Sequence, residues 1–258
     1  MLKITNLSKT YGAGENATQA IADLSFEVNR GEFVCIVGPS GCGKTTLLKA
    51  ISGLLPATSG TVELDGKPIT APPEQMALVF QDYSRSLYPW MTVAANVEFP
   101  LRRKPISKGE RRQTVQKSLE SVGLEGFTGK YPWQLSGGMQ QRVAIARGLA
   151  YRPEILLMDE PFASVDAQTR SDLEDLVLKL RHDYGITIVF VTHDIDESVY
   201  LADRVVILTQ RPTVVQETLE VPLPRPRDQV TTKELPEFAQ LRAHVYRAIK
   251  RPDALVPA

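Results

Sequence analysis

The sequence has few cysteines, no long apolar run and no net charge. Cys35 and Cys42 are the two cysteines among 258 residues, too few for a disulfide framework, which fits a reducing compartment. No run approaches the roughly 20 apolar residues that span a bilayer. Lysine plus arginine equals aspartate plus glutamate at 30 each, which argues against a dedicated nucleic-acid surface. We therefore expect a cytosolic protein that binds no nucleic acid and reaches a membrane only through a partner.

Short apolar runs that alternate with helical patterns indicate the fold class. The runs FVCIVG, MALVFQ, EILLMDE, TIVFVTHD and RVVILTQ are typical of strands buried on both faces. Helices are predicted near them at residues 44–52, 108–122, 139–150 and 167–184. This alternation predicts an α/β core with a mostly parallel sheet and flanking helices.

Two further regions differ from that core. The segments LKITNLS, IADLSFEV and GTVELDG alternate apolar and polar residues, which predicts a small antiparallel β subdomain with an Asp-Gly turn. Residues from about 82 to 141 lack strand signals and are predicted to form a helical subdomain.

The C-terminal part is predicted to be an appendage. Residues 1–221 form the predicted main domain, and PLPRPRDQ after Val221 reads as a linker, because prolines remove the N–H groups that a central strand needs. Phe238, Leu241, Val245 and Ile249 then recur at near-helical spacing. Residues 222–258 are therefore expected to be a proline-rich linker followed by an amphipathic helix.

A phosphate-binding loop is the strongest chemical motif. GPSGCGKT, residues 38–45, fits G-x-x-x-x-G-K-[ST] and lies between the strand FVCIV and the helical run TLLKAIS. Its glycines let backbone N–H groups surround phosphate oxygens. Lys44 can reach the β- and γ-phosphates, and Thr45 offers a hydroxyl to Mg²⁺.

Polar residues at the ends of other predicted strands complete a catalytic set. Asp159 and Glu160 follow the apolar run ILLM; we expect Asp159 beside Mg²⁺ and Glu160 to polarise an attacking water. His193 follows TIVFVT, and Gln81 follows MALVF, where its amide can touch the metal or the water. The plainer alternatives are an acidic cap of the next turn, a solvated histidine and an ordinary turn glutamine. Together these residues predict a Mg-dependent nucleoside triphosphatase.

A second glycine motif, QLSGGMQQR at residues 134–142, poses the question of why one chain carries two anion sites. Its serine and two glycines precede a helical pattern, and free N–H groups at such a helix start can receive a phosphate. The alternative is a serine that only caps its own helix.

The motif LSGGMQQR resembles the signature of the ABC ATPases. The neighbouring motifs match in the same order: the phosphate loop, Gln81, the signature, the acidic strand end, ASVD at 163–166 and His193. The resemblance covers residues 1 to about 220 and implies the ABC ATPase fold. It also implies a head-to-tail homodimer with ATP between the phosphate loop of one copy and the signature of the other.

The resemblance implies a role for each matching residue. Tyr11 would stack on adenine, although a sheet-packing role stays open; Glu160 would be the base, and His193 would hold the γ-phosphate and the water. Gln81 would couple the metal site to the helical subdomain. Asp166 ends a loop that crosses the dimer interface and reads Ala-Ser-Val-Asp, where the family commonly has Ser-Ala-Leu-Asp.

The implied site has three parts. The ATP-binding residues in cis are Tyr11, Gly38, Pro39, Ser40, Gly41, Cys42, Gly43, Lys44, Thr45 and Thr46. The residues offered in trans are Ser136, Gly137, Gly138, Gln140 and Asp166, and the Mg²⁺ ligands are Thr45, Gln81 and Asp159. Because Cys42 lies inside the loop, alkylation is expected to inhibit the enzyme and ATP to protect it.

The tail and the helical subdomain indicate transport. The tail RPTVVQETLEVPLPRPRD and the stretch LYPWMTVAANVEFPL resemble the nitrate, sulfonate and taurine importer ATPases. The resemblance implies partners: integral membrane permease subunits, a periplasmic solute-binding protein that acts through them, and a position on the cytoplasmic face of the bacterial inner membrane. Tyr83, Tyr88 and Trp90 form either the permease docking surface or the subdomain's own core.

Alternative functions remain at this stage. Importers of thiamine-precursor pyrimidines have similar sequences, and a non-transport ABC ATPase or a P-loop small-molecule kinase belongs to another class. A DNA-repair clamp, which is one kind of non-transport ABC ATPase, would need a longer insertion between Gln81 and Ser136, and a kinase would not need the signature. The transported substrate is chosen by proteins outside this chain.

Overall fold

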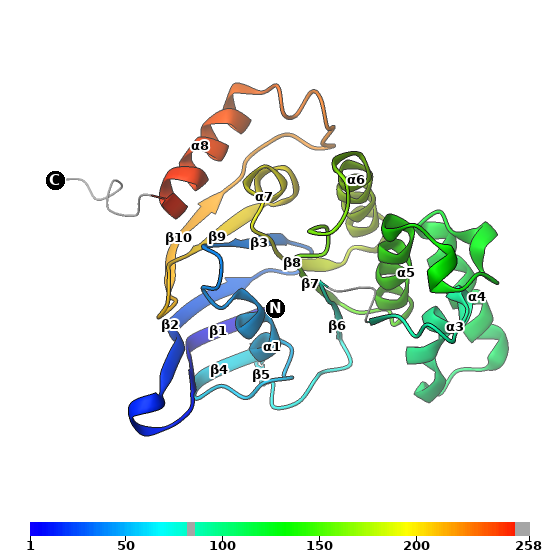
Figure 1. Cartoon of the computed structure of the whole chain (residues 1–258), viewed down its shortest axis with the longest axis horizontal. Helices are drawn as coiled ribbons and strands as arrows, with labels where there is room; N and C mark the ends of the chain where they lie inside the picture. The colour runs from blue at the N-terminus through cyan, green and yellow to red at the C-terminus, as the bar shows by residue number, and fades with distance from the viewer. Residues whose placement is uncertain (82–85, 251–258) are drawn as a thin grey trace. The chain divides into compact units, whose positions relative to one another are not determined.

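The computed structural model describes residues 1–81 and 86–250 (Figure 1). It contains two compact units, one formed by residues 1–73 and 187–258 and the other by residues 74–186. Tyr83, one of the three predicted docking aromatics, and the predicted start of the helical subdomain at residue 82 lie outside the described residues. The predicted boundary at 221/222 stays a prediction.

An antiparallel sheet forms one part of the first unit. Its strands are β1 (Leu2–Tyr11), β2 (Thr18–Val28), β4 (Ser59–Leu64) and β5 (Lys67–Pro68), in the order β2-β1-β4-β5. Leu2, Ile4 and Leu7 of β1 are buried. The Asp65-Gly66 pair between β4 and β5 has positive φ at both residues, which is the backbone that such tight turns need. The small antiparallel sheet is confirmed.

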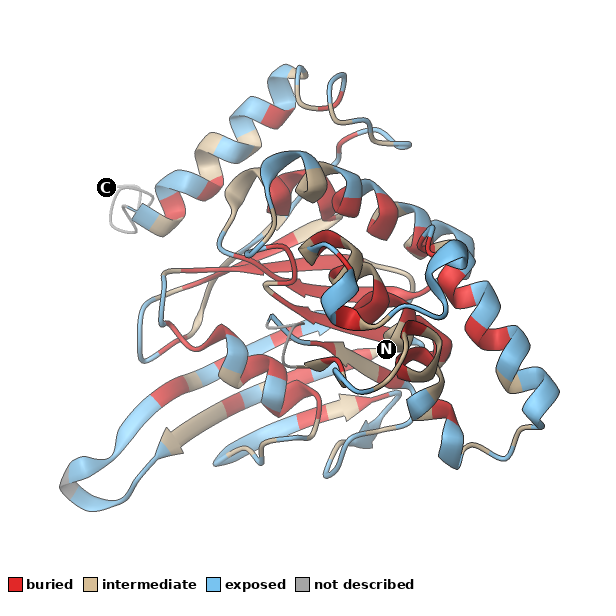
Figure 2. Cartoon of the chain, turned by 45° about the vertical axis from the view of Figure 1, so that its right-hand side comes forward, coloured by how far each residue is buried: buried red, intermediate tan, exposed pale blue. Residues whose placement is uncertain are grey.

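Parallel strands form the other sheet of this unit. β3 (Phe33–Val37) pairs in parallel with β8 (Thr187–Val191) and β9 (Arg204–Leu208), and β10 (Val215–Glu220) joins β9 antiparallel. Every residue of β3 and β8 is buried (Figure 2), as continuous apolar runs predict. The unit also holds α1 (Lys44–Ile51), α7 (Ile195–Leu201) and the short helix η1 (Gly14–Asn16).

The C-terminal part folds back on the same unit. Val221 and Leu223 are buried, and the chain continues without a strand to helix α8 (Pro236–Lys250). The buried positions of α8 are Phe238, Val245 and Ala248. The helix is where the sequence predicts it. Leu241 and Ile249 of the predicted apolar face are only half-buried, because the buried face of α8 is shifted and includes Ala248.

The second unit combines two strands with helices. β6 (Met76–Val79) pairs in parallel with β7 (Ile155–Asp159). Between residues 86 and 141 the regular elements are all helical, as predicted for this region. The helices of the unit are α3 (Val93–Glu98), η2 (Phe99–Arg103), α4 (Lys108–Ser121), η3 (Glu125–Phe127), η4 (Pro132–Gln134), α5 (Gly137–Ala150) and α6 (Ala167–Tyr184).

Candidate active site

The phosphate loop lies between β3 and α1. Gly41 and Gly43 adopt φ of 74° and 117°, a region that residues with a Cβ rarely occupy. A Cβ on Gly38 would lie 3.0 Å from Leu208 Cβ and 3.1 Å from Cys42 Sγ. The glycine spacing of the motif is therefore required by the backbone and by close packing.

Lys44 lies across this loop. Its side chain is buried, and its Nζ donates to the carbonyl oxygens of Gly38 at 3.0 Å and Pro39 at 3.3 Å. This places an ammonium group beside glycine-rich backbone at the start of a helix, where an anionic phosphate is favoured. The residues present therefore fit a nucleotide phosphate.

Two predicted ligands flank the loop in the same unit. Tyr11, at the end of β1, has its hydroxyl 3.2 Å from Thr46 Oγ1, so the predicted adenine-stacking ring lies next to the first turn of α1. Its side chain is 44% exposed, which leaves a ring face for a ligand. Thr45 is also exposed.

Thr213 is a supporting residue that sequence reasoning missed. Its buried hydroxyl donates to the carbonyl oxygen of Cys42. Its backbone N–H donates to Ala20 at 3.1 Å, and Ala22 donates back to its carbonyl at 2.9 Å. Thr213 therefore ties the phosphate loop to β2. A contact across 171 positions leaves no local sequence signal.

Cys42 is less accessible than its place in the motif suggests. The side chain is 2% exposed, and burial raises the pKa of its thiol, although Lys44 and Arg211 oppose that shift. The thiolate is the reactive form. Slow alkylation is therefore expected, and inhibition by alkylation with protection by ATP stays a prediction.

The acidic strand end lies in the second unit. Asp159 is the last residue of β7 and is buried. Glu160 follows with φ of 43°, a left-handed conformation that is uncommon outside glycine and concentrates at functional sites. Gln81, beyond the end of the parallel strand β6, donates from Nε2 to Glu160 Oε2 at 3.4 Å. The two predicted catalytic residues of this unit therefore meet at one sheet edge.

His193 lies between β8 and α7 in the first unit. The ring is exposed, and the backbone on both sides of it is fixed. Thr192 Oγ1 accepts from Asp194 N at 2.9 Å, and Asp194, the N-cap of α7, accepts from Glu197 N at 3.1 Å. Thr192 N also donates to Ile36 O of β3 at 3.2 Å, so the position of the imidazole depends on the end of β8 before it and on α7 after it.

The signature segment starts α5. Ser136 is the N-cap, and its hydroxyl accepts from Met139 N at 3.3 Å. Because capping begins the helix at Gly137, α5 starts two residues before its predicted position. Gln140 Nε2 donates to Leu135 O at 3.3 Å. The serine caps its own helix, and it is also exposed, so capping and ligand binding are compatible.

Gly138 connects the signature to Asp166. A Cβ on Gly138 would lie closer than 3.0 Å to Thr169 Cγ2. Thr169 donates from N and Oγ1 to the Asp166 carboxylate at 3.0 and 2.7 Å, and these bonds lower the pKa of Asp166. Two of the residues predicted to act in trans thus contact the same threonine.

The family of this chain follows from a comparison with known sequences. The model of the ABC transporter family matches residues 21–163. The chain belongs to this family. The matched range contains the phosphate loop, Gln81, the signature and the acidic strand end.

Several known proteins are similar to this chain along most of their length. An uncharacterized ABC transporter ATP-binding protein of Methanocaldococcus jannaschii is 49% identical, over 96% of this chain and 91% of the relative. The nitrate import ATP-binding protein of Synechococcus elongatus is 44% identical, over 96% and 92%. A bicarbonate transport ATP-binding protein of Synechocystis is 42% identical, over 93% and 86%.

A solved structure shares the fold. The dimeric ATP-binding cassette MJ0796, in a post-hydrolysis state bound to ADP and Pi, aligns with a TM-score of 0.75 at 36% identity, over 86% of this chain and 99% of that one. The ABC ATPase fold predicted from the motifs is therefore confirmed. The chain with the present sequence is therefore an ATP-hydrolysing transport ATPase.

Proposed function

We propose that this ATPase drives the import of a small anion as the nucleotide-binding subunit of a membrane transporter. The main support is the similarity to a nitrate import ATP-binding protein, which extends over 92% of that protein's length. The similarity to a bicarbonate transport ATP-binding protein supports the same anion class. No helix among the residues that the structure describes is long and apolar enough to cross a membrane. In this proposal, permease subunits hold the ATPase at the cytoplasmic face of the inner membrane, and a periplasmic binding protein delivers the anion.

The proposed hydrolysis assigns one task to each of the predicted site residues. Lys44 and the loop N–H groups bind the phosphates, Glu160 accepts a proton from the attacking water, and His193 orients that water and the γ-phosphate. Thr45, Gln81 and Asp159 offer hydroxyl, amide and carboxylate oxygens, which are the hard ligands that Mg²⁺ prefers. Mg²⁺, when bound, neutralises charge on the phosphates.

The proposed active site is completed by a second copy. The first turn of α5, with its exposed serine and free N–H groups, suits a γ-phosphate presented by another chain. ATP would then join two copies head to tail, and hydrolysis would release them. The dimeric relative bound to ADP and Pi supports this arrangement.

The proposed permease contact lies on the second unit. A cavity of about 660 Å³ is lined by residues that include Phe80, Tyr88, Phe99 and Arg147. The rings of Tyr88 and Phe99 lie 4.6 Å apart, and those of Tyr88 and Trp90 lie 5.5 Å apart. Tyr88 is half-buried while Trp90 is 69% exposed. Trp90 therefore suits docking, and Tyr88 shapes the wall of the cavity.

The transport proposal is tested by reconstitution. The ATPase would be purified with its permease subunits and placed in proteoliposomes with the cognate binding protein. We expect nitrate or bicarbonate to stimulate ATP hydrolysis and labelled anion to accumulate. Stimulation by a thiamine-precursor pyrimidine, with none by any anion, would refute the anion class.

The trans site is tested separately with Ser136→Arg. The new side chain would block the first turn of α5, and the residues of the phosphate loop stay unchanged. ATP binding by the monomer should persist while the ATP-dependent dimer is lost, as measured by light scattering. An unchanged dimer would refute the trans role of the signature.

A further inference from the structure

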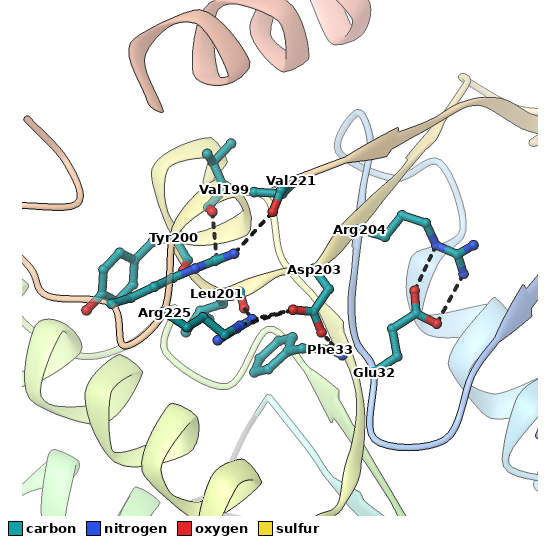
Figure 3. Close-up of polar contacts among 10 residues, drawn as sticks. Glu32, Phe33, Val199, Tyr200, Leu201, Asp203, Arg204, Val221 and Arg225 are labelled. Carbon is teal, nitrogen blue, oxygen red and sulfur yellow. Dashed lines mark hydrogen bonds and ion pairs between the residues drawn. The ribbon is translucent and has the colours of Figure 1, made fainter. Parts of the chain in front are cut away.

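The segment after β10 makes polar contacts with the end of α7 (Figure 3). Arg227 donates from Nη1 to the carbonyl oxygens of Val199, at 3.1 Å, and Tyr200, and from Nη2 to Val221 O at 3.4 Å. Arg225 Nη2 lies 3.4 Å from Leu201 O. Two guanidinium groups therefore bind three consecutive carbonyls of the last turn of α7.

These contacts satisfy groups that the helix itself cannot satisfy. The last carbonyls of an α-helix have no intrahelical donor, and its C-terminus carries partial negative charge. A planar guanidinium presents several donors at once and stays charged. Because α7 has only seven residues, too few for a stable isolated helix, its position depends on outside contacts: the burial of its last five residues and these arginine bonds.

Arg225 also connects the tail to the strand that leads into the phosphate loop. Its Nε donates to Asp203 Oδ1 at 3.2 Å, while Asp203 Oδ2 accepts from Phe33 N at 2.9 Å (Figure 3). Asp203 N donates in turn to Phe33 O at 2.8 Å. Phe33 is the first residue of β3. One carboxylate thus joins the tail to β3.

The other end of α7 is held from α8. Arg242 Nε lies 2.9 Å from Asp196 Oδ1 in the first turn of α7. A cavity of about 550 Å³ lies between these helices and is lined by His193, Arg242 and Tyr246, among others. The segment 222–250 therefore contacts α7 at both ends, and His193 directly precedes that helix.

We propose that residues 222–250 act as a brace that positions His193 through α7, with Arg225 and Arg227 as its positioning residues. The inference rests on the proposed role of His193. The contacts described above, from Arg225, Arg227 and Arg242, are made to α7, Asp203 and Val221, so ATP binding is expected to persist without the brace. It assigns a function to the LPRPR segment, which the sequence alone describes as a linker.

The test uses the full-length ATPase with Arg225→Gln, Arg227→Gln and both changes together. We expect kcat of the double variant to fall at least about tenfold with little change in KM for ATP, since small misplacements of catalytic groups cost rate. Arg30→Gln is the matched control, because it removes an exposed arginine–carboxylate pair, Arg30–Asp65, from the same unit. The control should keep the wild-type kcat.

A double-mutant cycle with His193→Ala separates positioning from general stability. If the brace acts through the histidine, the arginine changes should lower kcat no further in the His193→Ala background. Additive losses would overturn the inference. A rise in KM with unchanged kcat would overturn it as well.

Hydrogen exchange tests the contact between the brace and α7 without using turnover as the readout. Amides of residues 194–201 should exchange faster in the double arginine variant than in the wild type, with no such change in β8. If His193→Ala turns over at the wild-type rate, the role of His193 fails and exchange alone decides the brace. Unchanged protection of α7 would then overturn it.

Discussion

Thr169 fills the space that a side chain on residue 138 would need. Its Cγ2 lies closer than 3.0 Å to the ideal Cβ position of Gly138, while its hydroxyl donates to Asp166 at 2.7 Å. Packing inside one chain therefore favours glycine at position 138, whether or not a ligand binds there.

Gly138→Ala should be destabilising, and Thr169→Ser should rescue it. The added methyl overpacks the contact at a cost of about 1–3 kcal/mol, and turnover should fall. Serine removes Cγ2 yet keeps the bond to Asp166. Thermal unfolding and ATPase rates of both single variants and the double variant measure the effect. Gly126→Ala, where nothing lies within 4 Å, should be neutral, and a double variant no better than Gly138→Ala would refute the packing explanation.

Glu160→Gln should retain ATP binding and lose turnover by about 10²–10⁴-fold, as expected when a general base is removed. The variant should accumulate as an ATP-bound dimer, detectable by gel filtration. Glu125→Gln, an exposed acid of the same unit, serves as the control. Hydrolysis by Glu160→Gln at the wild-type rate would exclude Glu160 as the base.

Cys42 should react slowly in the native protein. The thiol is buried, and its pKa lies above the ordinary value of 9.0, so little thiolate exists at neutral pH. In a Cys35→Ala background, iodoacetamide labelling should be much slower than in urea-denatured protein and should accelerate as pH rises past 9. Equal native and denatured rates at pH 7 would contradict the burial of this thiol.

The Asp166 carboxylate should give a pH-dependent contribution to stability. Its pKa is lowered by hydrogen bonds from the Thr169 backbone and hydroxyl. A lowered pKa in the folded state means that the carboxylate stabilises the fold above the ordinary value of 3.8 and loses this effect as pH falls through the folded pKa. The difference in urea midpoint between wild type and Asp166→Ala should therefore shrink below about pH 3.8. A constant difference down to pH 3 would contradict this assignment.

Local sequence predicted the parts of the molecule that are built locally. The phosphate loop, the strand ends at Asp159 and His193, and the Asp65-Gly66 turn follow from residue types at fixed spacing. α5 begins at Gly137, two residues before the predicted start at Met139. The apolar periodicity used for the prediction does not show the Ser136 cap that sets the helix start. β10 escaped prediction, since its residues are only partly buried and lack the apolar run of the central strands.

Contacts between distant segments were not predictable. Thr213 reaches Cys42 and Arg227 reaches Val199 through the folded chain, and no spacing rule links those positions. Gln81 meeting Glu160 follows from the register of two parallel strands, Val79 opposite Met158, which becomes known only with the topology. The residues that support the site are therefore known only from the tertiary structure, while short sequence motifs predict the candidate catalytic and binding residues themselves.

The pairing of Asp203 with Arg225 limits how far the chain can be shortened for biochemical work. A version cut after residue 221 would keep every catalytic motif. It would lose the ion pair between Asp203 and Arg225 and the hydrogen bonds that Arg225 and Arg227 donate to the last turn of α7. Reduced turnover in such a fragment would reflect the missing tail, and it would be misread as a property of the nucleotide site. Expression designs and fusion partners should therefore leave the sequence intact through Lys250.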